Sequence, residues 1–220
     1  MENLKIFTLL STNGIVLEKE QIESLKRLHD ELLYWNKKVN LISRKDTENI
    51  WERHIIHSLV ILKYFDLKEK ARCLDVGTGG GFPGVPLKIA SPELRITLVD
   101  SINKKVKIAD MFGQHTGLKN IHGICSRMEE LPAKKEFYRT FDYIFARAVA
   151  PISQLLYWTQ YLIKPGGEYI FLKGGDLNEE IQTAKKEFKN YIYDEIPITF
   201  IGIDWFEQES KKIIHIRVPK

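Results

Sequence analysis

The sequence predicts an α/β protein in which a mostly parallel sheet follows a helical segment. From Ala71 onward, short apolar runs alternate with amphipathic stretches, which is typical of βα units with right-handed crossovers. A glycine cluster follows the first apolar run, at the position where open parallel sheets bind ligands. Before Ala71, apolar side chains recur at helical spacing. We therefore expect a helical cap over residues 1–70 and a ligand-binding domain over 71–220.

The individual elements follow from apolar periodicity and turn residues. In the cap we expect a long amphipathic helix from residue 20, with apolar positions as far as 39, and a second helix over 47–64. Five parallel strands are expected at 73–76, 96–100, 121–125, 143–146 and 168–173, the last after a Pro-Gly-Gly turn at 165–167. Intervening helices are expected at 85–90, 104–115, 126–130 and 152–163. The tail adds a helix over 178–190 and an antiparallel hairpin of 191–201 and 212–218.

Composition restricts the possible functions. No apolar run approaches transmembrane length, and the first 14 residues lack the pattern of a secretory signal, so we expect a cytoplasmic protein without membrane attachment. A net charge of +4 permits a polyanionic partner without requiring one. Cys73 and Cys125 both fall in strands that we expect to be buried. Six dispersed histidines show no metal-ligand spacing, so no metal is expected.

Residues 73–87, CLDVGTGGGFPGVPL, predict a strand, a tight turn and the N-terminus of a helix. Such a unit holds nucleotide-like ligands. Gly79, Gly81 and Gly84 match the dinucleotide fingerprint, and Asp100 ends the next apolar run at the distance of a ribose-binding acid. An NAD-dependent oxidoreductase is therefore one interpretation.

Asp75 favours a different ligand, S-adenosylmethionine (SAM). It stands two residues before Gly77, the first glycine of the cluster. A carboxylate there would repel a pyrophosphate but attract the ammonium and sulfonium groups of SAM. In this interpretation Asp100 accepts hydrogen bonds from both ribose hydroxyls, and Met128 and Glu129 line the adenine, because ligands bind beyond the carboxyl ends of the strands.

The segment after the fourth strand restricts the chemistry of a methyl transfer. ARAVAP, residues 146–151, lacks the N/D-P-P-Y/F segment of amino-methylating enzymes, and neither cysteine follows a proline as in cytosine C5 enzymes. The remaining type of nucleophile already has a free lone pair. Guanine N7 is an acceptor of this type and needs no general base. No catalytic residue is certain, and catalysis would depend on orientation and electrostatics.

Several segments together resemble the RsmG (GidB) family of bacterial 16S rRNA guanine-N7 methyltransferases. They are LLYWNKKVNLIS, ERHIIHSL, DVGTGGGFPGVPL, LVDS, CSRMEEL, ARAVAP and YIFLKGG. The resemblance covers residues from about 32 to 173 and implies a Rossmann-like SAM-dependent methyltransferase fold, a seven-stranded mostly parallel sheet with an antiparallel edge strand. It also implies methylation of guanine 527 in the 530 loop of 16S rRNA, within the small subunit or an assembly intermediate, by a monomer. A small-molecule methyltransferase remains an alternative.

The resemblance also implies roles for single residues. Its SAM contacts fall on the residues Gly77, Phe82, Met128, Glu129 and Arg147, and Asp75, Gly79 and Asp100 join them from the wider fold. On the RNA side we expect Lys37, Lys38, Arg44 and Arg53 of the cap, together with Lys173 after the fifth strand. Arg147 and Lys173 are the candidates nearest the substrate. His57 departs from the family, which usually has Asp there, so a pairing of that Asp with an arginine would be lost.

Overall fold

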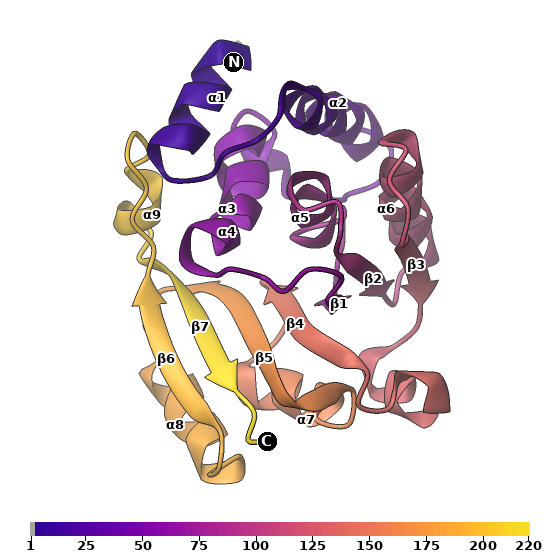
Figure 1. Ribbon diagram of the computed structural model, residues 1–220, viewed down its shortest axis with the longest axis vertical. Coiled ribbons are helices and arrows are strands. Elements are labelled where there is room, and N and C mark those ends of the chain that lie inside the picture. The colour runs from indigo at the N-terminus through magenta and orange to yellow at the C-terminus, as the bar shows by residue number, and fades with distance from the viewer. Residues whose placement is uncertain (1–2) are drawn as a thin grey trace.

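The computed structural model describes residues 3–220 and has a seven-stranded sheet at its centre (Figure 1). The strand order is β3-β2-β1-β4-β5-β7-β6. The strands are β1 (Arg72–Val76), β2 (Arg95–Asp100), β3 (Ile121–Cys125), β4 (Phe141–Arg147), β5 (Ile163–Gly174), β6 (Ile192–Pro197) and β7 (Lys211–Arg217). Strands β1 to β5 pair in parallel, and β7 runs antiparallel between β5 and β6. The predicted sheet is confirmed, with the antiparallel pair β6–β7 at its edge.

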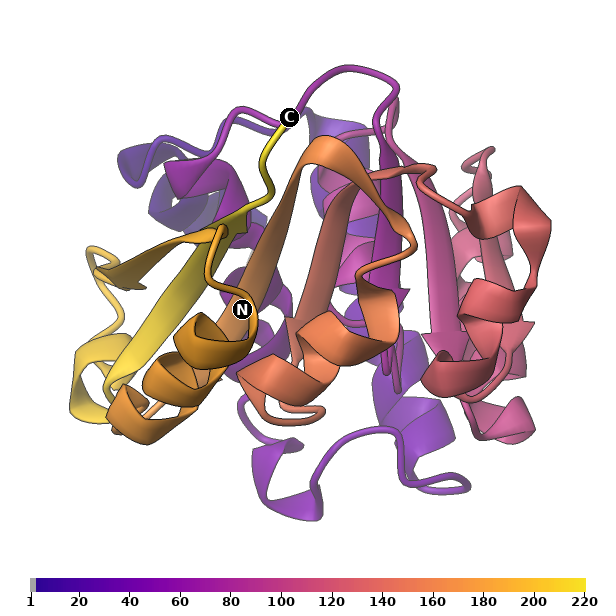
Figure 2. The ribbon, with the colours of Figure 1, turned by 90° about the horizontal axis from the view of Figure 1, so that it is seen from below.

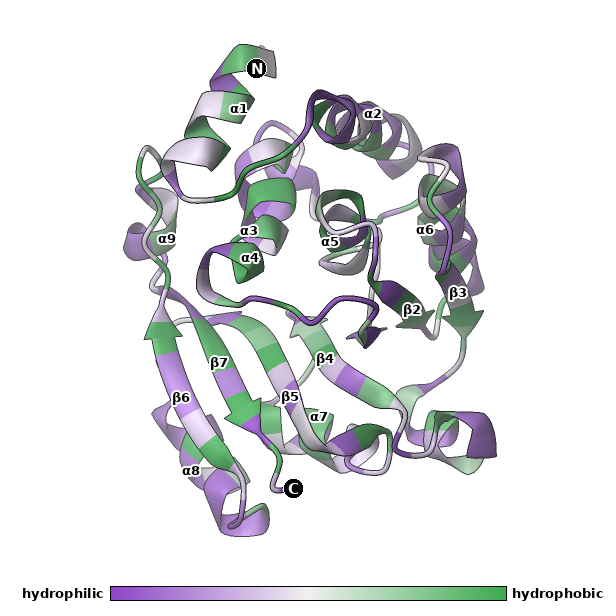
Figure 3. Cartoon of the chain, in the orientation of Figure 1, coloured by the Kyte–Doolittle hydropathy of each residue, from purple (hydrophilic) through white to green (hydrophobic). Residues whose placement is uncertain are grey.

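Helices cover both faces of this sheet (Figure 2). They are α1 (Asn3–Thr12), α2 (Lys19–Asn36), α3 (His57–Leu59), α4 (Ile61–Tyr64), α5 (Gly84–Ala90), α6 (Asn103–His115), α7 (Ile152–Thr159), α8 (Asn178–Glu187) and α9 (Trp205–Gln208). The outer helices α2, α6 and α8 are mainly hydrophilic (Figure 3). Their apolar residues face inward, as amphipathic spacing predicts. None of the helices within residues 3–220 is both long and apolar enough to cross a bilayer.

The alternating side chains of the central strands divide the core into two halves. Phe145 and Ile170 belong to the same core cluster as Ile6 and Leu25 of the N-terminal helices. The opposite face of the sheet packs against α7 and α8. The helical cap is thus built into one of the two cores and does not form a core of its own.

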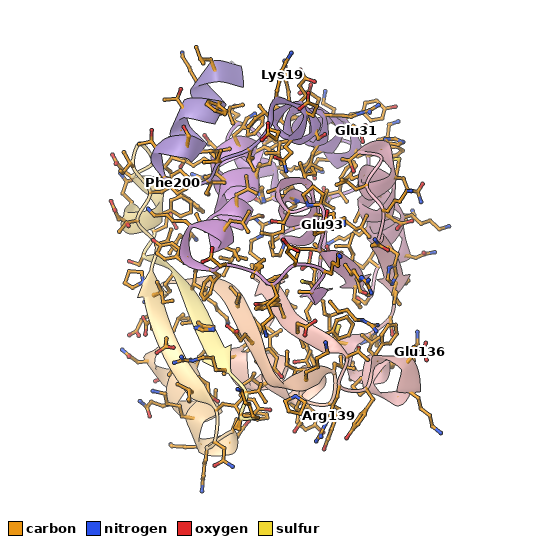
Figure 4. All side chains as sticks on the ribbon, viewed as in Figure 1. Lys19, Glu31, Glu93, Glu136, Arg139 and Phe200 are labelled. Carbon is orange, nitrogen blue, oxygen red and sulfur yellow. The ribbon has the colours of Figure 1, made fainter. Side chains whose placement is uncertain are left out.

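The cap also binds the connection between β6 and β7. Asn13 donates to the carbonyl oxygen of Ile201 (3.0 Å) and accepts from its N–H (2.8 Å). Nearby, Phe200 is buried beside the N-terminal helices, whereas Lys19, Glu136 and Arg139 lie at the periphery (Figure 4). These contacts bring the C-terminal segment close to the cap.

The second cap helix is less regular than the sequence predicts. A 3-10 turn at Arg44–Asp46 comes first, capped by Ser43, and a π-helix over Trp51–Ile56 then leads into α3 and α4. Asp46, just before the expected second helix, accepts from Arg53. The long helix α2 ends at Asn36, because the Asn36 side chain accepts from the N–H groups of two residues in the following loop.

The bounds of five further elements differ from the prediction. Residues 126–130 form part of a 3-10 helix over Met128–Ala133, and α7 ends at Thr159 because β5 already begins at Ile163. The Pro-Gly-Gly turn lies within β5 as an irregular stretch, where the register with β4 shifts. In the tail, α8 and β6 are shorter than expected. Cys73 is buried, but the prediction for Cys125 was wrong: it is exposed, because β3 is an edge strand.

Candidate active site

Two adjoining cavities lie at the carboxyl ends of the parallel strands. The larger cavity has a volume of about 510 Å³ and the smaller one about 360 Å³. Residues of the cap, of the glycine loop after β1 and of the C-terminal segment 205–211 line the larger cavity. The loops after β2, β3 and β4 line the smaller cavity. Both cavities share the residues Gly77, Asp100, Lys105 and Ala148, so together they form one elongated site.

The glycine loop forms the boundary between the cavities. Gly77 has φ +65°, and a Cβ added there would lie 2.6 Å from a methyl group of Val149. Only glycine allows the loop after β4 to approach this closely. Val149 lines the smaller cavity, so the two loops shape its wall together.

Asp75 lies beneath this loop and lines neither cavity. It is fully buried, and one carboxylate oxygen accepts from the Thr78 hydroxyl (2.7 Å) and from the N–H of Gly84 (2.9 Å). The other oxygen is buried without a partner. Burial raises the pKa of Asp75 to about 7, against the opposing effect of these hydrogen bonds. Asp75 therefore acts on the shape of the loop and on the field in the site.

Asp100 lies at the end of β2 and faces both cavities. Its carboxylate accepts from the N–H groups of Gly79 (3.0 Å) and Ile102 (2.9 Å), one at each oxygen. A carboxylate oxygen has a further lone pair, so Asp100 can also accept from a ligand. Met128 and Glu129 line the same smaller cavity. The structure thus brings together three residues that the sequence placed at separate strand ends.

Arg147 connects the end of β4 to the cap. Its guanidinium donates to the carbonyl oxygen of Arg53 (3.0 Å) and contacts Nδ1 of His54 (2.9 Å). The guanidinium carbon lies 4.9 Å from the ring centroid of Phe82, in cation–π geometry. All four residues line the larger cavity. Burial lowers the pKa of Arg147 to about 10, so it stays charged at neutral pH.

His54 is a neutral hydrogen-bond acceptor in this arrangement. An arginine only donates, so Nδ1 of His54 must carry a lone pair, and its proton is on Nε2. Nε2 lies 3.3 Å from a carboxylate oxygen of Asp46. Burial, followed by the charge of Arg147, lowers the pKa of His54 to about 3. Asp46 also pairs with Arg53 (2.9 Å), which completes a network of four polar side chains.

The predicted RNA-binding residues are found in different environments. Lys37 and Arg44 are exposed and lie along a separate cavity beside α2. Lys38 donates to the hydroxyl of Tyr34 (2.6 Å), and Arg53 belongs to the network around Arg147. These four residues do not form a single cluster.

Lys173 does not present a free ammonium. Its side chain is only 12% exposed and donates to Glu180 (2.6 Å) and to the carbonyl oxygen of Ala150 (2.9 Å). Glu180 in turn accepts from the N–H of Ile152. Lys173 therefore holds the loop after β4, and its place on the RNA side stays a prediction.

The sequence analysis did not identify several residues of the site. Lys105 lines both cavities, Trp158 lines the smaller one, and Trp205 and Lys211 line the larger one. Lys105 could have been found, because it stands in the first turns of the helix after Asp100. Trp205 and Lys211 had no sequence signal, because only the path of the C-terminal hairpin brings them to the site.

His57 is buried and lines the larger cavity. Its ring packs against Trp205 and Phe206, with centroid distances of 5.3 and 5.5 Å. Burial, and then the charge of Arg147, keeps the pKa of His57 well below its ordinary value, so the ring is neutral. Over residues 3–220, no cluster of three or more His, Cys, Asp or Glu side chains is placed to hold a metal ion.

Known proteins of similar fold are SAM-dependent methyltransferases. A putative enzyme of this class from Methanococcus maripaludis superposes with a TM-score of 0.60 at 15% identity, covering 80% of this chain and 90% of that one. A SAM-dependent O-methyltransferase from Thermotoga maritima superposes with a TM-score of 0.55 at 14% identity, covering 80% and 70%. At such identities the similarity concerns the fold alone.

Sequence comparison identifies the family. The family model described as rRNA small subunit methyltransferase G matches residues 21–201. The ribosomal RNA small subunit methyltransferase G of Chlorobium limicola is 41% identical over 179 residues, which cover 81% of this chain and 79% of the relative. The protein of the same name from Flavobacterium psychrophilum is 37% identical over 206 residues, 91% of each chain. The chain therefore belongs to the rRNA small subunit methyltransferase G family.

Proposed function

We propose that this protein methylates N7 of a guanine in 16S rRNA, guanine 527 of the 530 loop, with SAM as the methyl donor. Family membership supports SAM-dependent methylation of small-subunit rRNA. The resemblance of the motifs supports the base and the position. The substrate would be the small subunit or an assembly intermediate, and the enzyme would act as a cytoplasmic monomer.

The residues present fit SAM. Gly77 has no side chain, so the glycine loop lies directly against the loop after β4. Asp100, Met128 and Glu129 line the adjoining smaller cavity. We assign the nucleoside part of SAM to this smaller cavity and its amino acid part to the glycine loop. SAM supplies a methyl group bound to a positively charged sulfur. The buried carboxylate of Asp75 contributes a negative potential beneath that position.

The observation that carries the choice of N7 is that three candidate general bases of the cavity already act as hydrogen-bond acceptors. Among the described lining residues, His54 accepts from Arg147, and Asp46 accepts from Arg53. Asp100 accepts from two backbone N–H groups. A nucleophile that must lose a proton would need one of these groups to be free. Guanine N7 has a lone pair and no proton, so it fits a site of this kind.

Arg147 is the residue best placed to orient the base. Arginine carries five N–H donors, and Arg147 uses two of its nitrogens for Arg53 and His54. A remaining donor can bind guanine O6, the acceptor next to N7. This contact would leave N7 itself free. Asp46, near His54, would offset the positive charge that the base gains on methylation.

A labelling experiment tests the proposal. Purified protein and labelled SAM are incubated with small ribosomal subunits from a strain that lacks the enzyme, and the rRNA is digested and analysed by nucleoside mass spectrometry. We expect labelled 7-methylguanosine that maps to the 530 loop, and its loss with the Arg147→Ala variant. If SAM binds but no RNA nucleoside is labelled, a small-molecule substrate becomes the better interpretation. If NAD binds and SAM does not, the oxidoreductase alternative returns.

A further inference from the structure

The C-terminal segment lines the larger cavity and not the smaller one. Trp205, Glu209 and Lys211 line the larger cavity from this segment, and Arg53 of the π-helix and His57 of α3 line it from the cap. The guanidinium carbon of Arg53 lies 5.8 Å from the Trp205 ring centroid, and the ammonium of Lys211 lies 4.9 Å from it. Two cations therefore flank one indole ring.

The side chain of Lys211 is held in place by its surroundings. It lies across Gly174 of β5, where an added Cβ would be 3.0 Å from Cδ and 3.3 Å from Nζ of Lys211. The side chain is 22% exposed. Its stem is thus packed between a glycine and an indole, and little conformational entropy remains to be lost when a ligand binds.

The positive charge at this end of the cavity is only partly balanced. Of the carboxylates in residues 3–220, Glu209 alone comes within 4 Å of the Lys211 ammonium, at 3.9 Å, and its side chain is 55% exposed. Such a pair is weak. Arg53 pairs with Asp46 through a terminal nitrogen, whereas its Nε is buried without a hydrogen-bond partner. The site therefore offers donors and positive charge that Glu209 and Asp46 balance only in part.

We propose that Arg53, Trp205 and Lys211 form a subsite for a backbone phosphate of the rRNA next to the methylated nucleotide. A phosphate is negatively charged and only accepts hydrogen bonds, which matches these donors. The indole already contacts both cations and His57, so its role is to hold the two cations in place. Stacking of an RNA base on this ring is therefore disfavoured. The inference depends on the proposed function, since it assigns to the larger cavity a second part of the same substrate.

The test compares two neighbouring lysines of β7. Lys211→Met removes the charge and keeps the stem. Lys212→Met is the matched control, because the side chains of neighbouring residues in a strand point to opposite faces of the sheet. Lys212 pairs with Glu195 of β6 (2.6 Å). Binding to small subunits from a strain lacking the enzyme is measured over a series of KCl concentrations. SAM affinity is measured in parallel as a check on the rest of the site.

For Lys211→Met we expect roughly three- to tenfold weaker subunit binding, and a slope of log Kd against log salt that is lower by about one. SAM affinity stays unchanged, Lys211→Arg keeps wild-type binding, and Lys212→Met changes neither quantity. Unchanged affinity and slope for Lys211→Met would overturn the subsite, as would a lower melting temperature with an unchanged slope. The labelling experiment tests the proposed reaction separately. The reaction is wrong if wild-type protein binds subunits but does not label guanine N7.

Discussion

Nδ1 of His54 lies 2.9 Å from a guanidinium nitrogen of Arg147, so the cap and the end of β4 meet inside the larger cavity. The contact requires a neutral imidazole, which agrees with the lowered pKa of His54. Asp46 stands on the other side of the ring, with an oxygen 3.3 Å from Nε2. The orientation of Arg147 thus depends on residues of the cap, far from it in the sequence.

Removing the acceptor should impair catalysis. We expect His54→Phe to lower the rate of methyl transfer roughly ten- to hundredfold, because a hydrogen bond to a charged group is lost and Arg147 is no longer held. His54→Asn can place an amide oxygen near the position of Nδ1 and should retain much of the activity. The control is His122→Phe, at an exposed position on β3. Equal rates for His54→Phe and the control would remove His54 from the positioning of Arg147.

The two buried histidines should make the protein sensitive to acid. His54 has a pKa of about 3 and that of His57 is lowered in the same direction, so both bind protons more readily in the unfolded chain. Their contribution is complete above pH 6.5 and declines as the pH falls toward 3, by up to ~1.4 kcal/mol per pH unit for each group. Urea unfolding at several pH values measures this slope. His57→Gln should flatten it, and a change at the exposed His122 should not.

Asp75 should affect stability in the opposite direction. Its pKa is raised to about 7, so the folded protein holds this proton more tightly than the unfolded chain, and stability falls as the pH rises from about 4 to 7. Asp75→Asn keeps an acceptor for Thr78 and Gly84 without the buried charge. We expect a higher melting temperature than wild type at pH 8 and a loss of SAM affinity of roughly threefold or more. Unchanged SAM affinity would show that the carboxylate acts through loop shape alone.

The sequence predicted the sheet better than the site. Strands β1 to β3 were located within one residue, because each is a short, mainly apolar run bounded by polar residues or glycine. Ligands bind beyond the carboxyl ends of parallel strands, and this rule predicted that Asp100, Met128 and Glu129 lie close together. All three line the smaller cavity. The π-helix had no signal, because amphipathic spacing does not distinguish it from an α-helix over one turn.

Other site residues depend on contacts between distant segments. The ion pair of Lys173 with Glu180 was not predicted, because Glu180 lies in a helix whose approach to the loop cannot be deduced from spacing. Trp205 and Lys211 reach the cavity only because the hairpin of β6 and β7 packs against the cap. Such positions follow from tertiary structure, and local sequence does not encode them.

The pair of Lys173 and Glu180 should control the loop after β4. Lys173→Met releases the carbonyl oxygen of Ala150, so we expect roughly five- to twentyfold weaker SAM binding by calorimetry. The matched control is Lys164→Met, which breaks an ion pair of similar length with Asp142 (2.7 Å) elsewhere on β5. The salt dependence of subunit binding should not change for either variant. A lower salt slope for Lys173→Met would support the expectation of a phosphate contact.

Gly77→Ala tests the contact between the two loops. Its Cβ would lie 2.6 Å from a Val149 methyl group, so the loop after β4 must move, and we expect SAM binding to weaken at least roughly tenfold. Gly117→Ala is the control, because φ there is also positive (+71°) but nothing lies within 4 Å. Both variants share a backbone strain of about 1 kcal/mol, and only the first has the clash.

A second substitution separates the clash from the strain. Val149→Ala removes both methyl groups that an alanine at 77 would meet most closely. The double variant Gly77→Ala, Val149→Ala should therefore bind SAM more tightly than Gly77→Ala alone, although its backbone strain at 77 is the same. If the double variant binds SAM no better, the loss arises from the altered glycine backbone, and the approach of the loop after β4 is not what requires glycine at this position.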